Sequence, residues 1–289
     1  MMSLLLNVII GTIVLGSIYG LIALGFVYIF RSTGVINFAH GEFLTLGAWM
    51  TLSLAMLKPA IIGVALGCAA TGAVAALCYR IIVRRAETNG LFVAVIATMG
   101  VAFMLDGIML LIWGPTSQTL SLLPAGTVQF REGSGISIAN AIVVVISLVT
   151  YATVVITDRR LVIGMQMRAA AANRLLASQL GIRVGYLFTA AWFVAGVLAA
   201  IAGVAYGATT LVSPQLTAIG LAGLPAALVG GFDSVEGALP GGFLVALVVV
   251  LMSTFVSSAG SFAATYLLLL VFVMVRPQGL FGSVVVDRV

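Results

Sequence analysis

The stretch GSIYGLIALGFVYIF, residues 16–30, holds no charged residue and lies within a longer apolar run over residues 5–30. That run exceeds the about 20 apolar residues that a helix needs to cross a bilayer. Glycines recur along it at intervals of four or five residues, at Gly11, Gly16, Gly20 and Gly25. A stripe of small residues allows a neighbouring helix to approach closely. The stretch therefore predicts a transmembrane helix packed within a bundle.

The whole chain shares this apolar character. Of its 289 residues, 62% are hydrophobic and only 7% are charged, whereas soluble domains carry about 25% charged residues. A soluble protein of this composition would expose large apolar patches. No polar region is long enough for a separate soluble domain. The sequence therefore predicts one membrane domain over residues 1–289.

Further apolar runs follow the first one, at 43–57, 61–79, 91–112, 137–156, 186–206, 238–257 and 262–275. The stretch 216–232 is also apolar, but Gly220, Gly223, Pro225 and Gly230 interrupt it. Such a segment is typical of a broken or re-entrant helix that other parts of the protein surround. The expected fold is all-α, a polytopic transmembrane helical bundle of about eight spans plus this broken or re-entrant helix.

Arginine predicts the orientation. One short loop holds Arg80, Arg84 and Arg85, and the connection 157–185 holds Arg159, Arg160, Arg168, Arg174 and Arg183. Loops rich in arginine face the cytoplasm. Arg31 and Arg276 fall on that same side if 216–232 crosses the membrane. The N-terminus then lies outside and the C-terminus inside.

Several kinds of catalytic site are excluded by residues that the chain lacks. Lys58 is the only lysine, and it does not follow a G-x-x-x-x-G motif, so there is no phosphate-binding loop. One histidine and two distant cysteines cannot provide the usual ligands of a zinc site. A G-x-S-x-G motif is also absent. We therefore expect no enzyme activity and no cofactor, with the energy for any transport supplied by a partner or an ion gradient.

Four polar side chains in apolar surroundings are candidate pathway residues. Asn37, His40 and Glu42 lie together in GVINFAHGEF, and Asp106 lies well inside the run 91–112. They could line a path for a solute. Alternatively, Asn37 and Glu42 stabilise the first turn of a helix, and Asp106 forms a bond between helices. A carboxylate at such depth costs about 2.5–3.5 kcal/mol on insertion scales, so Asp106 should face the bundle interior.

The connection MQMRAAAANRLLASQLGIRVGYLF, residues 165–188, predicts a short cytoplasmic helix because its alanine-rich centre favours helix formation. Arg168 and Arg174 flank its apolar face, and Gly181 is expected to end it. The predicted face consists of Ala169, Ala170, Ala172, Leu176, Ala177 and Leu180. A small-sided helix of this kind could dock in a groove on a partner protein. The alternative is a helix that lies on lipid headgroups.

The stretch 220–242 is a further candidate for the pathway. Its glycines permit close helix approach, and Gly223 and Pro225 would shape a half-helix whose end holds a small solute. Tight packing of small residues explains the same pattern.

Several of these segments resemble the permease subunits of branched-chain amino acid ABC importers, and in particular the shorter of the two permeases in that family. The similar segments are GSIYGLIALGF, INFAHGEF, RAAAANRLLASQLGI, AGVLAAIAGVAYG, GLPAALVGGFDSVEGALPGG and, at 276–282, RPQGLFG. They span nearly the whole chain. The pair INFAHGEF and RPQGLFG is the most specific part of the resemblance.

The resemblance implies a multi-pass permease of the bacterial inner membrane. Its partners would be a second permease, in a heterodimer, two cytoplasmic ATPases that bind and hydrolyse ATP, and a periplasmic solute-binding protein. Residues Arg168 to Gly181 match the cytoplasmic coupling helix of ABC importers. The sequence departs from the pattern of this family at two places. It lacks an acidic residue before the alanines of the coupling segment, and it has Pro225 where the family pattern has a lysine-containing run. The solute therefore stays open between hydrophobic amino acids and urea or short amides.

A different class of transporter is the alternative. An ion-coupled carrier or channel would need no ATPase and would use Asp106 and Glu42 as ion or proton groups. Neither alternative gives the chain a nucleic-acid partner, since its arginines lie in short loops beside the membrane.

Overall fold

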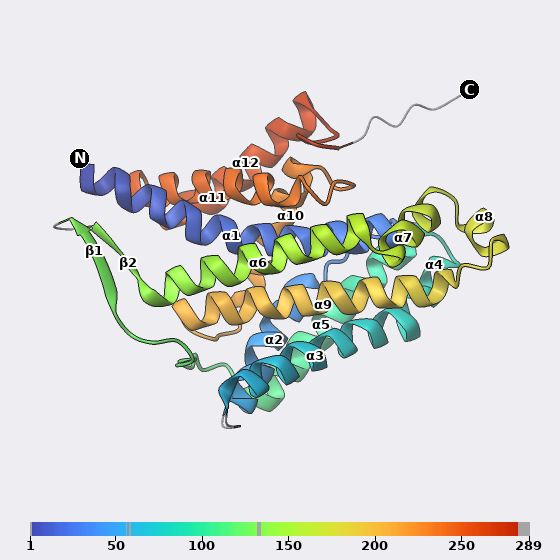
Figure 1. Ribbon diagram of the computed structural model, residues 1–289, viewed down its shortest axis with the longest axis horizontal. Coiled ribbons are helices and arrows are strands. Elements are labelled where there is room, and N and C mark those ends of the chain that lie inside the picture. The colour runs from blue at the N-terminus through green and yellow to red at the C-terminus, as the bar shows by residue number, and fades with distance from the viewer. Residues whose placement is uncertain (1, 56, 58, 132–133, 283–289) are drawn as a thin grey trace.

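A computed structural model describes residues 2–55, 57, 59–131 and 134–282, and it shows long helices running side by side (Figure 1). The helices are α1 Met2–Thr33, α2 His40–Leu54, α3 Ala60–Cys78, α4 Arg84–Glu87, α5 Leu91–Trp113, α6 Ile138–Arg160, α7 Val162–Ala172, α8 Arg174–Gln179, α9 Val184–Thr209, α10 Leu216–Gly230, α11 Ala238–Phe255 and α12 Ser258–Val275. A π-helical turn, Tyr79–Val83, joins α3 to α4. Strands β1 Thr127–Arg131 and β2 Ser134–Ser137 form an antiparallel hairpin.

Seven helical segments are long and apolar enough to cross a membrane: α1, α3 continued through α4, α5, α6, α9, α11 and α12. The predicted all-α polytopic bundle is therefore confirmed. The run predicted at 43–57 differs, because it belongs to α2, which has only 15 residues. At 1.5 Å per residue α2 is about 22 Å long, shorter than the about 30 Å hydrocarbon core. Figure 1 shows α2 inclined steeply to the long helices.

The segment 216–232 was predicted to be a broken or a re-entrant helix, and the structure contradicts only the break. α10 runs without interruption from Leu216 to Gly230, with Pro225 inside it. Proline removes one backbone hydrogen bond, but Pro225 is buried and tight packing on both sides holds the helix together. The chain turns only at Gly231, which has φ +113°.

The C-terminal end of α10 is hydrogen-bonded to residues near the end of the described chain. The amide of Leu280 donates to the carbonyl oxygen of Val229 at 2.8 Å, and the amide of Phe281 donates to that of Gly230 at 3.0 Å. These bonds satisfy two of the carbonyl groups that a helix leaves free at its C-terminus.

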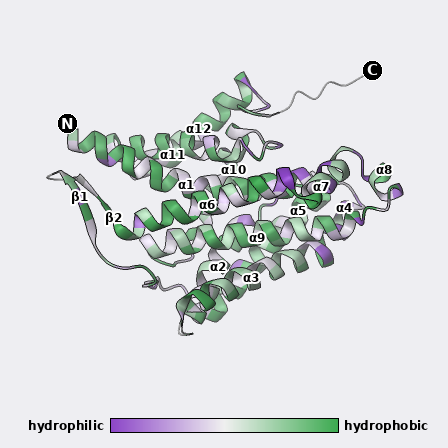
Figure 2. Ribbon diagram, in the orientation of Figure 1, coloured by the Kyte–Doolittle hydropathy of each residue, from purple (hydrophilic) through white to green (hydrophobic). Residues whose placement is uncertain are grey.

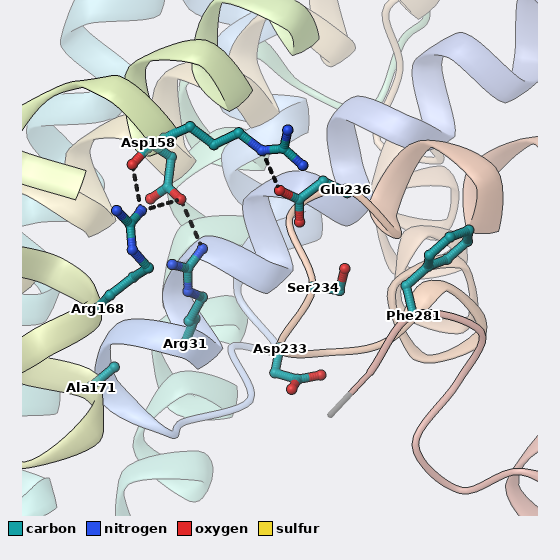
Figure 3. A pocket seen from close by; sticks show the side chains of 9 residues that line it. Arg31, Asp158, Arg168, Ala171, Asp233, Ser234, Glu236 and Phe281 are labelled. Atoms are coloured by element: carbon teal, nitrogen blue, oxygen red, sulfur yellow. Dashed lines mark hydrogen bonds and ion pairs between the residues drawn. The ribbon is translucent and has the colours of Figure 1, made fainter. Parts of the chain in front are cut away.

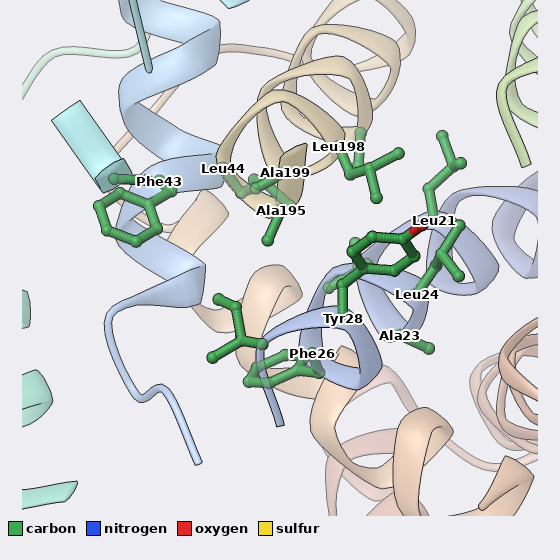
Figure 4. Packing of buried hydrophobic residues seen from close by; sticks show 14 of the residues in the cluster. Leu21, Ala23, Leu24, Phe26, Tyr28, Phe43, Leu44, Ala195, Leu198 and Ala199 are labelled. Carbon is green, nitrogen blue, oxygen red and sulfur yellow. The ribbon is translucent and has the colours of Figure 1, made fainter. Parts of the chain in front are cut away.

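Three of the four glycines of α1, Gly11, Gly16 and Gly20, pack against α11, whereas Gly25 faces His40 of α2. A side chain at Gly16 would collide with Phe243, and one at Gly20 would collide with Leu239. The other side of α1 contributes large apolar residues to the core, where they meet α2 and α9 (Figure 4). α1 is therefore the central helix of the bundle.

The two ends of the bundle differ in polarity. Hydrophilic residues gather at the end that carries α4, α7 and α8, whereas the N-terminus and the hairpin lie at the other end (Figures 1 and 2). Arg31 and Phe281 line one pocket at the hydrophilic end. The start of α1 and the described end of the chain therefore lie at opposite ends. This arrangement agrees with the predicted orientation if arginine marks the cytoplasmic side.

Candidate functional site

The polar stretch after α1 forms a turn that leads directly into α2. α1 is followed by Gly34, which has φ +74°. Thr98 of α5 fixes the turn, because its Oγ1 accepts a hydrogen bond from the amide of Phe38 at 3.1 Å. The Oδ1 of Asn37 accepts from the amide of Ala39 at 3.0 Å. Asn37 thus stabilises the turn and not the first turn of α2, where Ala39 is the capping residue and makes no side-chain bond.

Glu42 lies in the first turn of α2, as predicted. Together with Thr45 of α2 and Thr217 of α10 it forms a polar group, which we call the Glu42 cluster. The hydroxyl of Thr217 donates to Oε2 of Glu42 at 3.0 Å. The hydroxyl oxygens of Thr45 and Thr217 lie 2.9 Å apart. Asp106 on α5 is near enough to Glu42 to interact with it electrostatically. Of the predicted pathway residues, Glu42 therefore lies in a hydrogen-bonded cluster, and Asp106 takes no part in the hydrogen bonds of that cluster.

Neither Thr45 nor Thr217 was predicted from the sequence. Thr45 lies three residues after Glu42, a spacing that places two side chains on one helix face, so a local signal was present. No local signal links Thr217 to Glu42, because 175 positions separate them along the chain.

The other predicted pathway residues lie against α1. The ring of His40 packs on Phe26, with ring centroids 4.5 Å apart, and it fills the space that Gly25 leaves open. Gly223 lets α10 approach Ile22 of α1, and Pro225 is buried within α10. The contacts of His40 and Gly223 are those of packing residues, and the structure does not place them in the Glu42 cluster.

The connection 165–188, which was predicted to be one cytoplasmic helix, differs from that prediction. It contains two helices, α7 and α8, because Asn173 breaks the alanine run and its Oδ1 accepts from the amide of Leu176 at 3.0 Å. Gly181 ends α8, as predicted, with φ +80°. The amide of Gly181 donates to the carbonyl of Ser178, and that of Ile182 donates to the carbonyl of Ala177, a common ending for helices.

The break at Asn173 divides the predicted apolar face. Ala170 and Ala177 are buried against the rest of the chain. The remaining members of that face are exposed, namely Ala169, Ala172, Leu176 and Leu180. Leu175, which was not predicted, is 70% exposed, and Leu180 is 80% exposed. α8 projects beyond the long helices (Figure 1).

The two arginines that flank this connection bind other parts of the chain. Nη1 of Arg174 pairs with Glu87 at 3.4 Å, and Nη2 donates to the carbonyl oxygen of Thr33 at 2.5 Å. The guanidinium also lies over the ring of Phe188, 4.8 Å from its centroid. Arg168 pairs with Asp158 at 3.2 Å. Both arginines therefore fasten α7 and α8 to the ends of the long helices.

A cavity of about 590 Å³ opens at this hydrophilic end, beside the loop between α10 and α11 (Figure 3). On its rim, Nε of Arg159 donates to Oε1 of Glu236 at 2.7 Å. Partial burial would raise the pKa of Glu236, but the hydrogen bond from Arg159, a backbone bond and nearby arginine charges outweigh it and lower the pKa. Glu236 is therefore ionised at neutral pH.

Residues 8–276 match the family model described as "Branched-chain amino acid transport system / permease component". The chain belongs to this family. LivH of Escherichia coli K12, a high-affinity branched-chain amino acid transport system permease protein, is 27% identical, with 96% of this chain and 95% of LivH covered. BraD of Pseudomonas aeruginosa, which carries the same description, is 24% identical, with 98% of each chain covered.

Together with the seven apolar helices, this membership makes the permease a multi-pass protein of the inner membrane. Among solved structures, "PsaBC from Streptococcus pneumoniae in complex with Fab" aligns with a TM-score of 0.49 at 12% identity, with 93% of this chain and 91% of the other covered.

Proposed function

We propose that this chain is the permease subunit of an ATP-driven importer for branched-chain amino acids or related small polar solutes, such as urea and short amides. The match of residues 8–276 to permease components of branched-chain amino acid transport systems carries the proposal. The names of LivH and BraD support the class of solute. In this proposal the chain does no covalent chemistry and holds no cofactor. Partner subunits bind and hydrolyse ATP.

The proposed partners are a second permease, in a heterodimer, two cytoplasmic ATPases and a periplasmic solute-binding protein. The exposed leucines of α8 support contact with an ATPase. Leu175 and Leu176 are 70% and 55% exposed on α8, a six-residue helix outside the seven spans, and Leu180, directly after it, is 80% exposed. A short apolar surface of this kind fits a groove on another protein. We therefore place the ATPase contact on α7 and α8.

The proposed solute path follows α2, α5 and α10. Asp106 is a partly exposed carboxylate on the largely apolar helix α5. It forms no hydrogen bond or ion pair within the part of the chain that the structure describes. Polar groups inside a membrane usually face a partner or a pathway. Asp106 and the Glu42 cluster would replace part of the hydration of the solute. In this proposal Asn37 holds the turn before α2, His40 packs α2 on α1, and Gly223 and Pro225 shape α10.

Purification and transport assays test this proposal. The permease, extracted in mild detergent, should retain an ATPase and a second permease. Uptake of labelled leucine into cells should stop when ATP is depleted and persist when a protonophore removes the proton gradient.

The opposite result would favour the ion-coupled alternative. If the permease reconstituted alone accumulates leucine or another solute on a cation gradient, no ATPase is required. Asp106 and Glu42 would then be the candidate ion-binding groups.

A further inference from the structure

Asp158, near the cytoplasmic end of α6, joins three helices through one carboxylate oxygen. Its Oδ2 accepts from Nη1 of Arg31, at the end of α1, at 3.1 Å, and from Nη1 of Arg168, on α7, at 3.2 Å (Figure 3). Arg168 also donates to the backbone carbonyl of Asp158 at 2.5 Å. Asp158 is only 5% exposed, and the side chains of Arg31 and Arg168 are 15% and 41% exposed, so solvent screens the pair with Arg31 less than the pair with Arg168.

The backbone reinforces this junction. Gly164, in the first turn of α7, lies directly against the backbone of Asp158, and a side chain at this position would collide with the carbonyl group. α7 is therefore held to the end of α6 by backbone contact and by Arg168. A displacement of α7 must move Asp158 or break these contacts.

α6 is in turn bound to the loop between α10 and α11. The hydroxyl of Tyr151 donates to the carbonyl oxygens of Val235 at 2.9 Å and Glu236 at 3.0 Å. α10 carries Thr217, a member of the Glu42 cluster. These contacts link α7 through Asp158 to α6 and α1, and they link α6 through Tyr151 to the loop that follows α10.

Stability alone does not explain a buried carboxylate shared by two arginines. Buried ion pairs often contribute little net stability compared with apolar residues of similar volume, because both charges lose their hydration. They do fix the relative positions of the groups that they join. The arrangement at Asp158 therefore favours a role in positioning.

We propose that Asp158 is the positioning residue that transmits movement of the α7–α8 segment to α1 and α6. The proposal rests on the proposed function, because α7 and α8 must first receive that movement from an ATPase. Asp158 does not touch the solute. Without the carboxylate of Asp158, ATP hydrolysis should therefore continue while solute transport falls, and the ATPase should stay bound to the permease.

The experiment uses the complete importer in lipid vesicles, with ATP on the ATPase side and the binding protein with labelled leucine on the other. Asp158→Asn keeps the size of the side chain and removes its charge. We expect the ATPase to remain bound and ATP hydrolysis to continue. Uptake per ATP hydrolysed should fall by about fivefold or more, the lower end of typical coupling between sites.

Glu236→Gln is the matched control. It removes the Arg159–Glu236 pair, whose side chains are 63% and 43% exposed and which should contribute little. Uptake per ATP should stay at the wild-type value in this variant.

Three results would overturn the role of Asp158. Uptake per ATP hydrolysed could stay unchanged in Asp158→Asn, or uptake and ATP hydrolysis could decrease in proportion. The third such result is an equally large decrease of uptake per ATP in Glu236→Gln. If Asp158→Asn does not accumulate in the membrane, Arg31→Gln and Arg168→Gln are tested instead. Each of these variants removes one of the two ion pairs, and the same decrease of uptake per ATP is expected. Failure of all three to accumulate would assign Asp158 to folding and also overturn the proposal. A wild-type importer that shows no ATP-dependent uptake would instead contradict the proposed function.

Discussion

The hydroxyl of Thr217 on α10 donates a 3.0 Å hydrogen bond to Oε2 of Glu42 on α2 and so joins the two short helices of the bundle. Gly41 and Gly220 touch nearby, which brings the two backbones together. Neither helix is long enough to cross a bilayer by itself. They are therefore a packed pair, with α10 lying against α1 and α2 lying against α9.

Replacing Thr217 by valine should weaken both this pair and transport. Valine keeps the shape but leaves the buried carboxyl group of Glu42 without the donated bond, which typically costs about 1–3 kcal/mol. Thermal unfolding in detergent and leucine uptake would measure the two effects. Thr217→Ser, which keeps the hydroxyl, is the control and should resemble the wild type. Equal behaviour of the two variants would show that the bond is unimportant.

The contact between the short helices predicts that Gly220→Ala destabilises the fold. The added methyl group would collide with the backbone of Gly41, and such overpacking costs about 1–3 kcal/mol. Gly100→Ala on α5 is the matched control, since a methyl group there meets no atom within 4 Å in the described chain. We expect a lower melting temperature only for Gly220→Ala, and a similar decrease for both variants would argue against the close contact.

Asp106→Asn should reduce leucine uptake without affecting the amount of protein in the membrane. Asparagine has nearly the same size but lacks the carboxylate that we place in the proposed path. Asp106→Glu keeps the charge and serves as the control. Uptake at the wild-type rate in Asp106→Asn would assign Asp106 to packing.

Ala172→Arg should abolish association with the ATPase. Ala172 is exposed on α7, so the longer side chain can be accommodated in the isolated permease but would occupy the proposed contact surface. Co-purification from membranes measures the association, and the amount of inserted permease is compared in the same samples. Gln129→Arg in β1 adds the same charge at the opposite end of the bundle. Normal association in Ala172→Arg would contradict the docking role of this surface.

The features that could be predicted from the sequence are those with a local pattern. The glycine spacing of α1 gives its packing face, and Gly181 gives the end of α8. Asn173 also had a local signal that was overlooked, because asparagine favours the position before a helix. An alanine-rich run conceals this signal, since its high helix propensity suggests that the helix continues.

The remaining features depend on contacts between distant parts of the chain. Hydropathy cannot show that α2 begins at His40, because the turn before it is held by Thr98 of α5. It cannot show that α10 stays whole around Pro225, because α1 and α2 pack on it. The number of arginines predicts the cytoplasmic side, but it does not reveal that Asp158 binds two of them.

The bonds from Leu280 and Phe281 to the end of α10 have a consequence for biosynthesis. α11 and α12 lie between α10 and these residues, so the ribosome must complete two further helices before α10 obtains these bonds. Until then the carbonyl groups of Val229 and Gly230 lack these partners. The final conformation of α10 is therefore reached late, after every long helix of the bundle has been synthesised.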